Sequence, residues 1–225
     1  MSSAEVIVVQ NKDESQPGLN HELSPDQCLT KVMGIELHPS TLKDKFLFAT
    51  FQIIAEHGAD SLSANELIRK TESSKGALFH HFKTLDELCL ESLRFLRKNG
   101  RLSIDKEHNS LQEFLDLFVS DITERFSSKA YFHIVHFFRD RALKEEKFKQ
   151  VLNELYSVYV DGAVEHVMKY VSPNADRNKV RELVIFMYTS LERTSYRLLT
   201  SAQPADTQEV VNWFVKMIES RLKTY

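Results

Sequence analysis

From Thr41 to the end of the chain, apolar residues recur three and four positions apart, the spacing of one face of an α-helix. Glycine and proline stand mainly where this pattern breaks, as at Gly58, Gly100 and Pro204. No stretch shows the sustained alternation that is typical of a β-strand. The sequence therefore predicts an all-α protein.

The periodic stretches divide into four helices before Gly100 and about five after it. The first four are expected at about 42–57, 64–71, 74–82 and 85–99, and two of them begin with the pattern of a capping box, Ser63 with Glu66 and Thr84 with Glu87. Beyond Gly100 the amphipathic segments cover about 109–126, 130–141, 144–171, 176–200 and 206–222. This layout predicts a small N-terminal helical domain followed by a helical bundle.

The first forty residues lack the helical pattern. They carry two basic and six acidic residues, and they contain the turn-forming pairs Pro17-Gly18, Ser24-Pro25 and Pro39-Ser40. We interpret residues 1–40 as an irregular acidic arm, residues 41–87 as a first helical domain and residues 88–225 as a second.

Composition is that of an ordinary globular protein of one or two domains: 225 residues, 42% hydrophobic, with a formal net charge of −3. Cys28 and Cys89 belong to no metal-spaced cluster and are too few for a disulfide framework. The N-terminus has no positively charged region before an apolar core, and no stretch reaches the ~18 apolar residues of a spanning helix. These observations favour a cytoplasmic protein.

Two short helices joined by a tight turn, between two longer helices, outline a helix-turn-helix module. Ser63 and Thr84 stand at helix N-termini, where hydroxyl and free N–H groups can hold a phosphate. Gly76 and Ala77 carry little side chain, which lets a helix approach the major groove closely. The residues predicted to contact DNA are Ser63, Asn65, Lys75, Gly76, Ala77, Phe79, His80, Lys83 and Thr84.

The run SSKGALFHHFK at 73–83, with AEHG at 55–58 and NELIRK at 65–70, resembles the TetR family of bacterial transcriptional regulators. The resemblance in residues covers roughly 41–96, and the remainder matches in length and helical layout. It implies a sequence-specific, homodimeric regulator of double-stranded DNA, a repressor that acts on a palindromic operator. It also implies that a small molecule bound between the central helices lowers the affinity for DNA. Residues 41–87 are then expected to be the DNA-binding domain, and residues 88–225 the effector-binding and dimerisation domain.

Several positions depart from the family's pattern. Glu72 and Ser73 stand where a glycine and a valine are usual, Leu85 replaces a common lysine, Asn65 replaces a frequent basic residue, and Phe79 matches a position that usually carries a phosphate-contacting tyrosine. The changes at Glu72, Leu85 and Asn65 weaken the attraction to phosphate, and Glu72 also lacks the freedom of glycine at positive φ. We therefore expect a modest affinity for DNA, or one that depends on favourable base contacts.

The last two helical segments are apolar on two sides, and such a helix must bury both. Each is therefore expected to face its own bundle on one side and a second copy on the other, as the resemblance also implies. The residues predicted for the dimer interface are Met187, Leu191, Val210, Trp213, Phe214 and Met217. The alternative is a helix fully buried inside a monomer.

Aromatic residues are dense in the central segments and could line an apolar cavity with a few polar groups. The candidate pocket residues are Phe114, Phe118, His133, His136, Phe137, Tyr156, Tyr159 and Tyr188. A small apolar or aromatic effector is the expected ligand, and no cofactor or metal is predicted. The same side chains could equally form a plain core.

Two other functions stay open. The chain could be a helical dimer that binds a ligand or a protein partner and has a weakened DNA face. It could also be a metal-dependent enzyme that uses His133 and His136, one helical turn apart. The sequence contains no glycine-rich phosphate loop, GxSxG or HExxH pattern, so no enzyme is predicted.

Overall fold

A computed structural model describes residues 24–35, 38–100, 107–200, 205–222 and 224; within α9 and α10 it leaves the side chains of 198–200, 205–208, 210, 211 and 214 undescribed. Over these ranges the regular structure is helical and contains no strand, which confirms the all-α prediction. The elements are α1 (Pro25–Gln27), η1 (Cys28–Val32), α2 (Leu42–His57), η2 (Ala59–Ser61), α3 (Ala64–Thr71), α4 (Lys75–His81), α5 (Leu85–Asn99), α6 (Leu111–Ser127), α7 (Lys129–Lys144), α8 (Glu146–Met168), α9 (Arg177–Thr200) and α10 (Ala205–Leu222).

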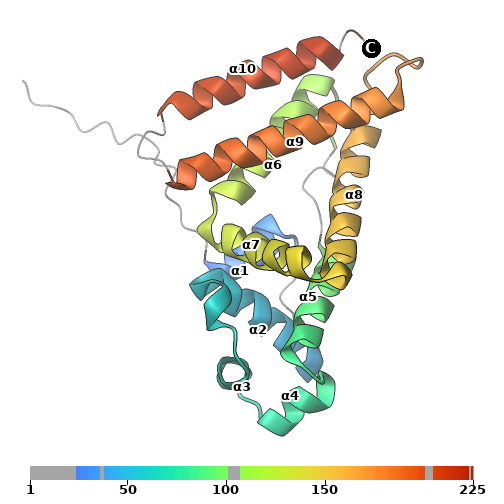
Figure 1. Ribbon diagram of the computed structural model, residues 1–225. Coiled ribbons are helices and arrows are strands. Elements are labelled where there is room, and N and C mark those ends of the chain that lie inside the picture. Colours follow the sequence, from blue (N-terminus) through green and yellow to red (C-terminus); the bar gives the residue numbers. More distant parts are fainter. Residues whose placement is uncertain (1–23, 36–37, 101–106, 201–204, 223, 225) are drawn as a thin grey trace, which may run out of the picture.

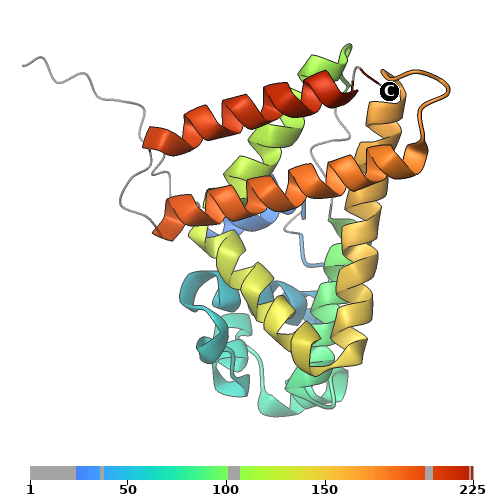
Figure 2. The ribbon, with the colours of Figure 1, turned by 45° about the horizontal axis from the view of Figure 1, so that its top comes forward.

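The molecule has two ends of different character. Helices α3 and α4 lie at the lower end in Figure 1, below α2, and α5 leads upward from them into the C-terminal helices. Helices α9 and α10 lie side by side at the opposite end, as the turned view in Figure 2 also shows. Helix α8 connects the two levels along one side. The small N-terminal module therefore projects from the bundle.

Local sequence accounts for where these helices begin. Thr41 and Asp44 form a reciprocal capping box at α2, with both hydrogen bonds 3.1 Å long. In each of the capping boxes predicted at α3 and α5, only one of the two reciprocal hydrogen bonds forms. The Ser63 hydroxyl accepts from the N–H of Glu66, whose carboxylate turns to Arg69 instead of back to the cap.

At α5 the Thr84 hydroxyl accepts from the N–H of Glu87 at 3.0 Å, as predicted. The Glu87 carboxylate, however, accepts from the N–H of Lys83 at 2.7 Å, one residue before the cap. The second hydrogen bond of the predicted box is therefore displaced by one residue, and it holds the backbone of Lys83 against the start of α5.

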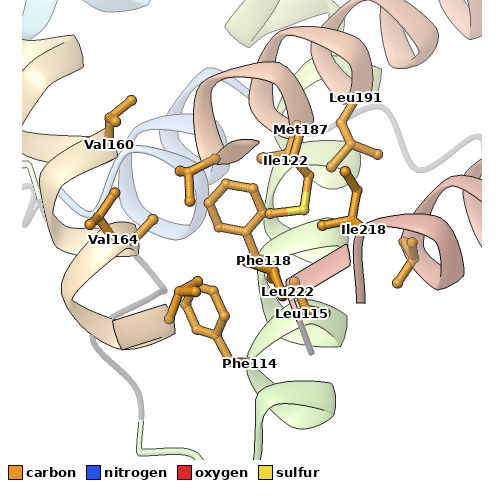
Figure 3. Close-up of a cluster of buried hydrophobic side chains, with 14 of the residues drawn as sticks. Phe114, Leu115, Phe118, Ile122, Val160, Val164, Met187, Leu191, Ile218 and Leu222 are labelled. Carbon is orange, nitrogen blue, oxygen red and sulfur yellow. The ribbon is translucent and has the colours of Figure 1, made fainter. Parts of the chain in front are cut away.

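Three groups of buried side chains hold the elements together. The upper core joins α6, α8, α9 and α10 and includes Phe114, Phe118, Ile122, Val164, Met187, Leu191, Ile218 and Leu222 (Figure 3). The lower core lies between α2 and the short helices and includes Phe46, Ile53, Leu67, Leu78, Phe82 and Leu88. The central core joins η1, α2, α5, α7 and α8 and includes Cys28, Leu29, Phe51, Cys89, Phe138 and Phe148. The central core is thus shared by the N-terminal module and the bundle.

The interpretation of residues 1–40 as irregular is wrong for residues 24–35. Ser24 and Gln27 form a capping box for α1, and η1 places Cys28, Leu29 and Met33 in the central core. The segment is too short to show a repeating apolar pattern, so its burial was not predictable from periodicity. Residues 1–23 and 36–37 of the predicted arm lie outside the described residues.

Both cysteines are buried and free of disulfides. Burial raises the pKa of the Cys28 thiol and that of the Cys89 thiol to about 12. The thiolate is the reactive form, so both side chains act as small apolar groups at neutral pH. None of the helices in the described ranges is long and apolar enough to cross a membrane.

Candidate nucleic-acid interface

Helices α3 and α4 form the helix-turn-helix that the sequence predicts, at the free lower end of the molecule (Figure 1). Leu67 on α3 and Leu78 on α4 are buried in the lower core, and Phe82 at the end of α4 lies beside them. These anchors fix one side of each short helix on α2 and α5. The opposite side of α4 is left to the solvent.

The turn between the two helices depends on a left-handed backbone at Glu72, with φ 51° and ψ 44°. This is the only non-glycine residue with positive φ in the part of the chain that the structure describes. The N–H of Ser73 donates to the carbonyl of Ile68 at 3.1 Å and so closes α3 around this residue. The glycine of the family's pattern therefore meets a real backbone requirement, and glutamate adopts the same conformation at a cost of about 1 kcal/mol.

The exposed face of α4 carries most of the predicted base contacts. Lys75, Gly76, Phe79 and His80 are exposed, with 38% of Phe79 accessible, and Ala77 is half-buried. A Cβ built on Gly76 would find only the Ser74 hydroxyl within 4 Å, at 3.8 Å. The protein itself does not require a glycine at this position. A small residue there matters only to a surface that approaches from outside.

The charges around α4 are partly neutralised within the module. Arg69 pairs with Glu66, and Lys70 pairs with Glu56 at 2.9 Å. Lys75 and Lys83 are exposed, and neither has a carboxylate within ion-pair distance among the described residues. The two lysines predicted to meet phosphate are therefore available, one at each end of α4.

The helix caps leave polar groups beside these lysines. The hydroxyls of Ser63 and Thr84 each accept a backbone hydrogen bond, as does that of Ser74, from the N–H of Ala77 at 3.1 Å. Their O–H hydrogens stay able to donate to an acceptor such as phosphate. Asn65 is exposed in the first turn of α3, close to the Ser63 cap.

Tertiary packing adds one basic residue that the sequence did not single out. The Lys43 ammonium at the start of α2 lies 5.7 Å from the centre of the Phe82 ring, just beyond α4. Nothing in the local sequence places Lys43 near α4, since the two are about forty residues apart. Leu85, where the family usually has lysine, packs against the lower core instead of reaching out.

A cavity of about 280 Å³ lies between α5, α7, α8 and α9. Of the predicted pocket residues, Tyr156, Tyr159 and Tyr188 line it. Its other lining residues were not in the predicted set, and among them are Arg125, Tyr131 and Arg139. The available signal was Arg125 itself, a charged residue three positions after Ile122 on the apolar face of α6.

The other predicted pocket residues lie elsewhere. Phe114 and Phe118 are fully buried in the upper core (Figure 3), and Phe137 belongs to the central core. The ring of His133 is 3.1 Å from the carbonyl of Ala55 at the end of α2, while His136 packs on Phe132 and Tyr196. The two histidines thus have different partners. Within the described ranges, no three histidine, cysteine or acidic side chains gather as a metal site would need.

The residues predicted for the dimer interface do not all lie on an exposed surface. Met187 and Leu191 do not face outward as predicted, because both are buried in the upper core of their own chain (Figure 3). Phe186, one position earlier and about 100° around α9, is 51% exposed. On α10, Trp213 is 64% and Met217 is 38% exposed, while the side chains of Val210 and Phe214 lie outside the described residues.

The fold and this site together define a helix-turn-helix protein with a helical C-terminal domain. Residues 46–91 match the family model of the bacterial regulatory proteins of the tetR family. A curated relative, the HTH-type transcriptional regulator QacR of Staphylococcus aureus, is 26% identical over 124 residues, which cover 53% of this chain. The match spans 65% of that relative, slightly less than two thirds of its length.

Solved structures show the same fold over a longer stretch. A transcriptional regulator from Rhodococcus superposes with a TM-score of 0.66 at 18% identity, over 81% of this chain and 98% of that one. The regulator FadR from Bacillus subtilis, solved in complex with stearoyl-CoA, has a TM-score of 0.53 at 15% identity, over 77% and 96% of the two chains. Over residues 46–91, the chain is similar to the bacterial regulatory proteins of the tetR family, and the solved structures show that the fold is shared beyond that stretch.

The left-handed turn gives a direct test of the geometry. Replacing Glu72 with glycine should raise the free energy of unfolding by about 1 kcal/mol, because glycine adopts positive φ without steric cost. Urea denaturation measures the change. Glu72→Gln is the matched control, since it removes the charge and keeps the strained backbone, and it should stay within about 0.5 kcal/mol of the original protein. Equal effects of the two substitutions would contradict a backbone cause.

Proposed function

We propose that this protein is a homodimeric, sequence-specific DNA-binding regulator of transcription, a repressor that releases its operator when a small molecule binds. The observation that carries the proposal is the exposed face of α4, which has the small residues Gly76 and Ala77 in its first turn and, at its two ends, lysines with no carboxylate partner among the described residues. A helix of this kind fits the major groove, with the lysines on the phosphate backbone on either side. The match of residues 46–91 to a family of regulators supports it.

The dimer would form through α9 and α10. Phe186, Trp213 and Met217 leave apolar surface exposed on these two adjacent helices, and such patches are typical of interaction sites. A two-fold axis there would place two copies of α4 on the same side of the assembly. Dimers of helix-turn-helix proteins read two half-sites one DNA turn apart, or a multiple of a turn, on a palindromic operator.

Regulation would act through walls that the cavity shares with the DNA-binding module. Leu93 and Leu96 of α5 and Phe138 of α7 line the cavity, and α5 follows α4 directly. The guanidinium of Arg141 on α7 pairs with Asp86 in the first turn of α5, two residues after the Thr84 cap. A ligand that binds more tightly to one arrangement of α5 and α7 increases the population of dimers with that arrangement. The spacing of the two α4 helices in the dimer then changes with it. That FadR from Bacillus subtilis was solved with stearoyl-CoA supports ligand binding in this fold.

Salt dependence tests the proposed phosphate contacts. Lys75→Ala or Lys83→Ala should weaken binding to every duplex sequence, and each should reduce the slope of log affinity against log salt by about 2 for a dimer, because each lost phosphate contact contributes about 0.9. Fluorescence anisotropy at several salt concentrations measures the slope. Lys179→Ala is the control and should leave the slope unchanged, because Lys179 is an exposed lysine of α9, a helix at the opposite end of the molecule from α4. An unaltered slope in both α4 variants would remove the proposed role of these lysines.

The dimer surface can be tested separately from DNA binding. Trp213→Glu should convert the dimer to monomers, because it places a charge within the apolar contact. Sedimentation velocity reports the change in mass. Leu143→Glu is the control, since Leu143 is 88% exposed on α7 and does not belong to the two helices proposed to form the interface. A Trp213→Glu protein that remains dimeric would place the interface elsewhere.

A further inference from the structure

We propose that the cavity ligand is a small organic acid, with an apolar body between α5, α7 and α8 and an anionic group held by Arg125 and the phenols beside it. This inference rests on the proposed function only where it calls the ligand an effector. The proposed binding chemistry depends only on the residues that line the cavity and their partners. The wall, the donors and the available volume each support it.

The wall has an unequal distribution of charge. Three arginines, Arg97, Arg125 and Arg139, line the cavity, and no aspartate or glutamate does so among the described residues. Four tyrosines and Asn153 complete its polar lining, and the tyrosines are Tyr131, Tyr156, Tyr159 and Tyr188. Guanidinium groups only donate hydrogen bonds, and each has five N–H donors. The wall therefore favours a ligand rich in acceptors, and a carboxylate suits a guanidinium best.

Arg125 is the deepest of the cations, with only 8% of its side chain exposed. Its Nε is 2.8 Å from a carboxylate oxygen of Asp121, but the Nε–H itself makes no hydrogen bond to any described residue. Burial opposes the charge on Arg125, but Tyr131 and Asp121 outweigh it and raise its pKa above the usual value. The group therefore stays charged, with donor capacity that the protein does not use fully.

Arg139 gives the anion a second cation. Its two terminal nitrogens bind both carboxylate oxygens of Glu192, with Nη2 to Oε2 at 2.9 Å. This pairing orients the guanidinium from behind and uses part of its five donors. Glu192 itself does not line the cavity. The pair thus presents N–H groups to the cavity and keeps the carboxylate out of it.

The phenols also act as donors. Burial, more than any neighbouring charge, raises the pKa of Tyr131, Tyr159 and Tyr188, so their hydroxyls stay protonated at neutral pH. The Tyr159 hydroxyl has a long contact, 3.4 Å, with Asp121. No described residue hydrogen-bonds the hydroxyl of Tyr188. Tyr188 is thus a donor placed for a ligand beside the two arginines.

The rest of the wall sets the body and size of the ligand. Leu93, Leu96, Ile134, Phe138, Leu152 and Leu155 provide an apolar surface. The volume of about 280 Å³ is roughly twice the ~150 Å³ of an apolar cavity that holds benzene. One aromatic ring with a short acidic arm, or an aliphatic acid of similar size, fits this space. Asn153 and Val158 are the exposed lining residues on α8, so the cavity opens along that helix.

Matched ligands that differ in charge alone test the proposal. The probes are 3-phenylpropanoate, 3-phenylpropanamide and 3-phenylpropylammonium, together with octanoate and octanamide, each titrated by calorimetry into the full chain. The acids should bind at least tenfold more tightly than their amides, and the ammonium compound should not bind. Equal or tighter binding of the amides would overturn the proposal in favour of a neutral ligand. Binding of the ammonium compound, or no binding by either acid, would also overturn it.

Variants locate the anion within the cavity. Arg125→Gln should remove the preference for acid over amide. Because Arg125 is buried beside Asp121, this variant can also unfold, so Tyr188→Phe provides a second test, in which only a hydroxyl is lost and acid affinity should fall severalfold. Arg181→Gln, outside the cavity on α9, is the control and should bind the acids unchanged. If Tyr188→Phe and a folded Arg125→Gln protein both keep the full preference, the anion lies elsewhere and the proposal fails.

The same titrations separate this inference from the proposed function. Calorimetry with the acids requires no DNA, so a protein that binds the acids and no duplex would contradict the regulator and leave the ligand class intact. A protein that binds duplex specifically and none of the acids would contradict the proposed ligand class and leave the regulator intact. Addition of 3-phenylpropanoate to a protein–duplex complex then shows whether the acid is an effector, because it should lower DNA affinity by the factor given by its preference for the released state.

Discussion

The ring of Phe51 on α2 packs against the ring of Phe138 on α7, with 6.0 Å between their centres, and much of the molecule depends on this contact. Phe51 belongs to α2, the helix that precedes the helix-turn-helix, and Phe138 lines the cavity. Both lie in the central core, which also contains Leu29 of the N-terminal segment. Protein interiors are close-packed, so a side chain displaced by a ligand must move its neighbours. The two proposed binding sites are therefore joined by one core.

Opposing contributions set the strength of the DNA-binding face. Lys75 and Lys83 are exposed and unpaired at the ends of α4, whereas Arg69 and Lys70 on α3 are already neutralised by carboxylates. Glu72 adds a negative charge and backbone strain at the turn between them. Surface ion pairs contribute little to stability, but they reduce the positive field that attracts DNA. The module thus keeps a helix-turn-helix geometry while part of its positive charge is already neutralised.

Sequence alone could predict the helices, because the long elements have a 3.6-residue apolar period, and α2, α5, α6 and α7 also begin at a side-chain cap. It could not predict the burial of Leu29, since the segment around it has too few turns to show a period. The residues that line the cavity could not be predicted from the sequence either. Whether Phe118 or Tyr159 faces a core or a space depends on how helices cross, and one residue of rotation separates buried Met187 from exposed Phe186. Local pattern therefore gives elements and faces, while tertiary packing decides their neighbours.

The most direct test of the regulator is selection of bound sequences from a pool of random duplexes by the full chain, repeated at two salt concentrations. Specific recognition by a dimer predicts an enriched inverted repeat whose half-sites lie one helical turn, about 10 base pairs, or a multiple of it apart. The same repeat should persist at the higher salt concentration, where non-specific binding falls steeply. Failure of a folded, ligand-free protein to enrich any sequence would contradict the account.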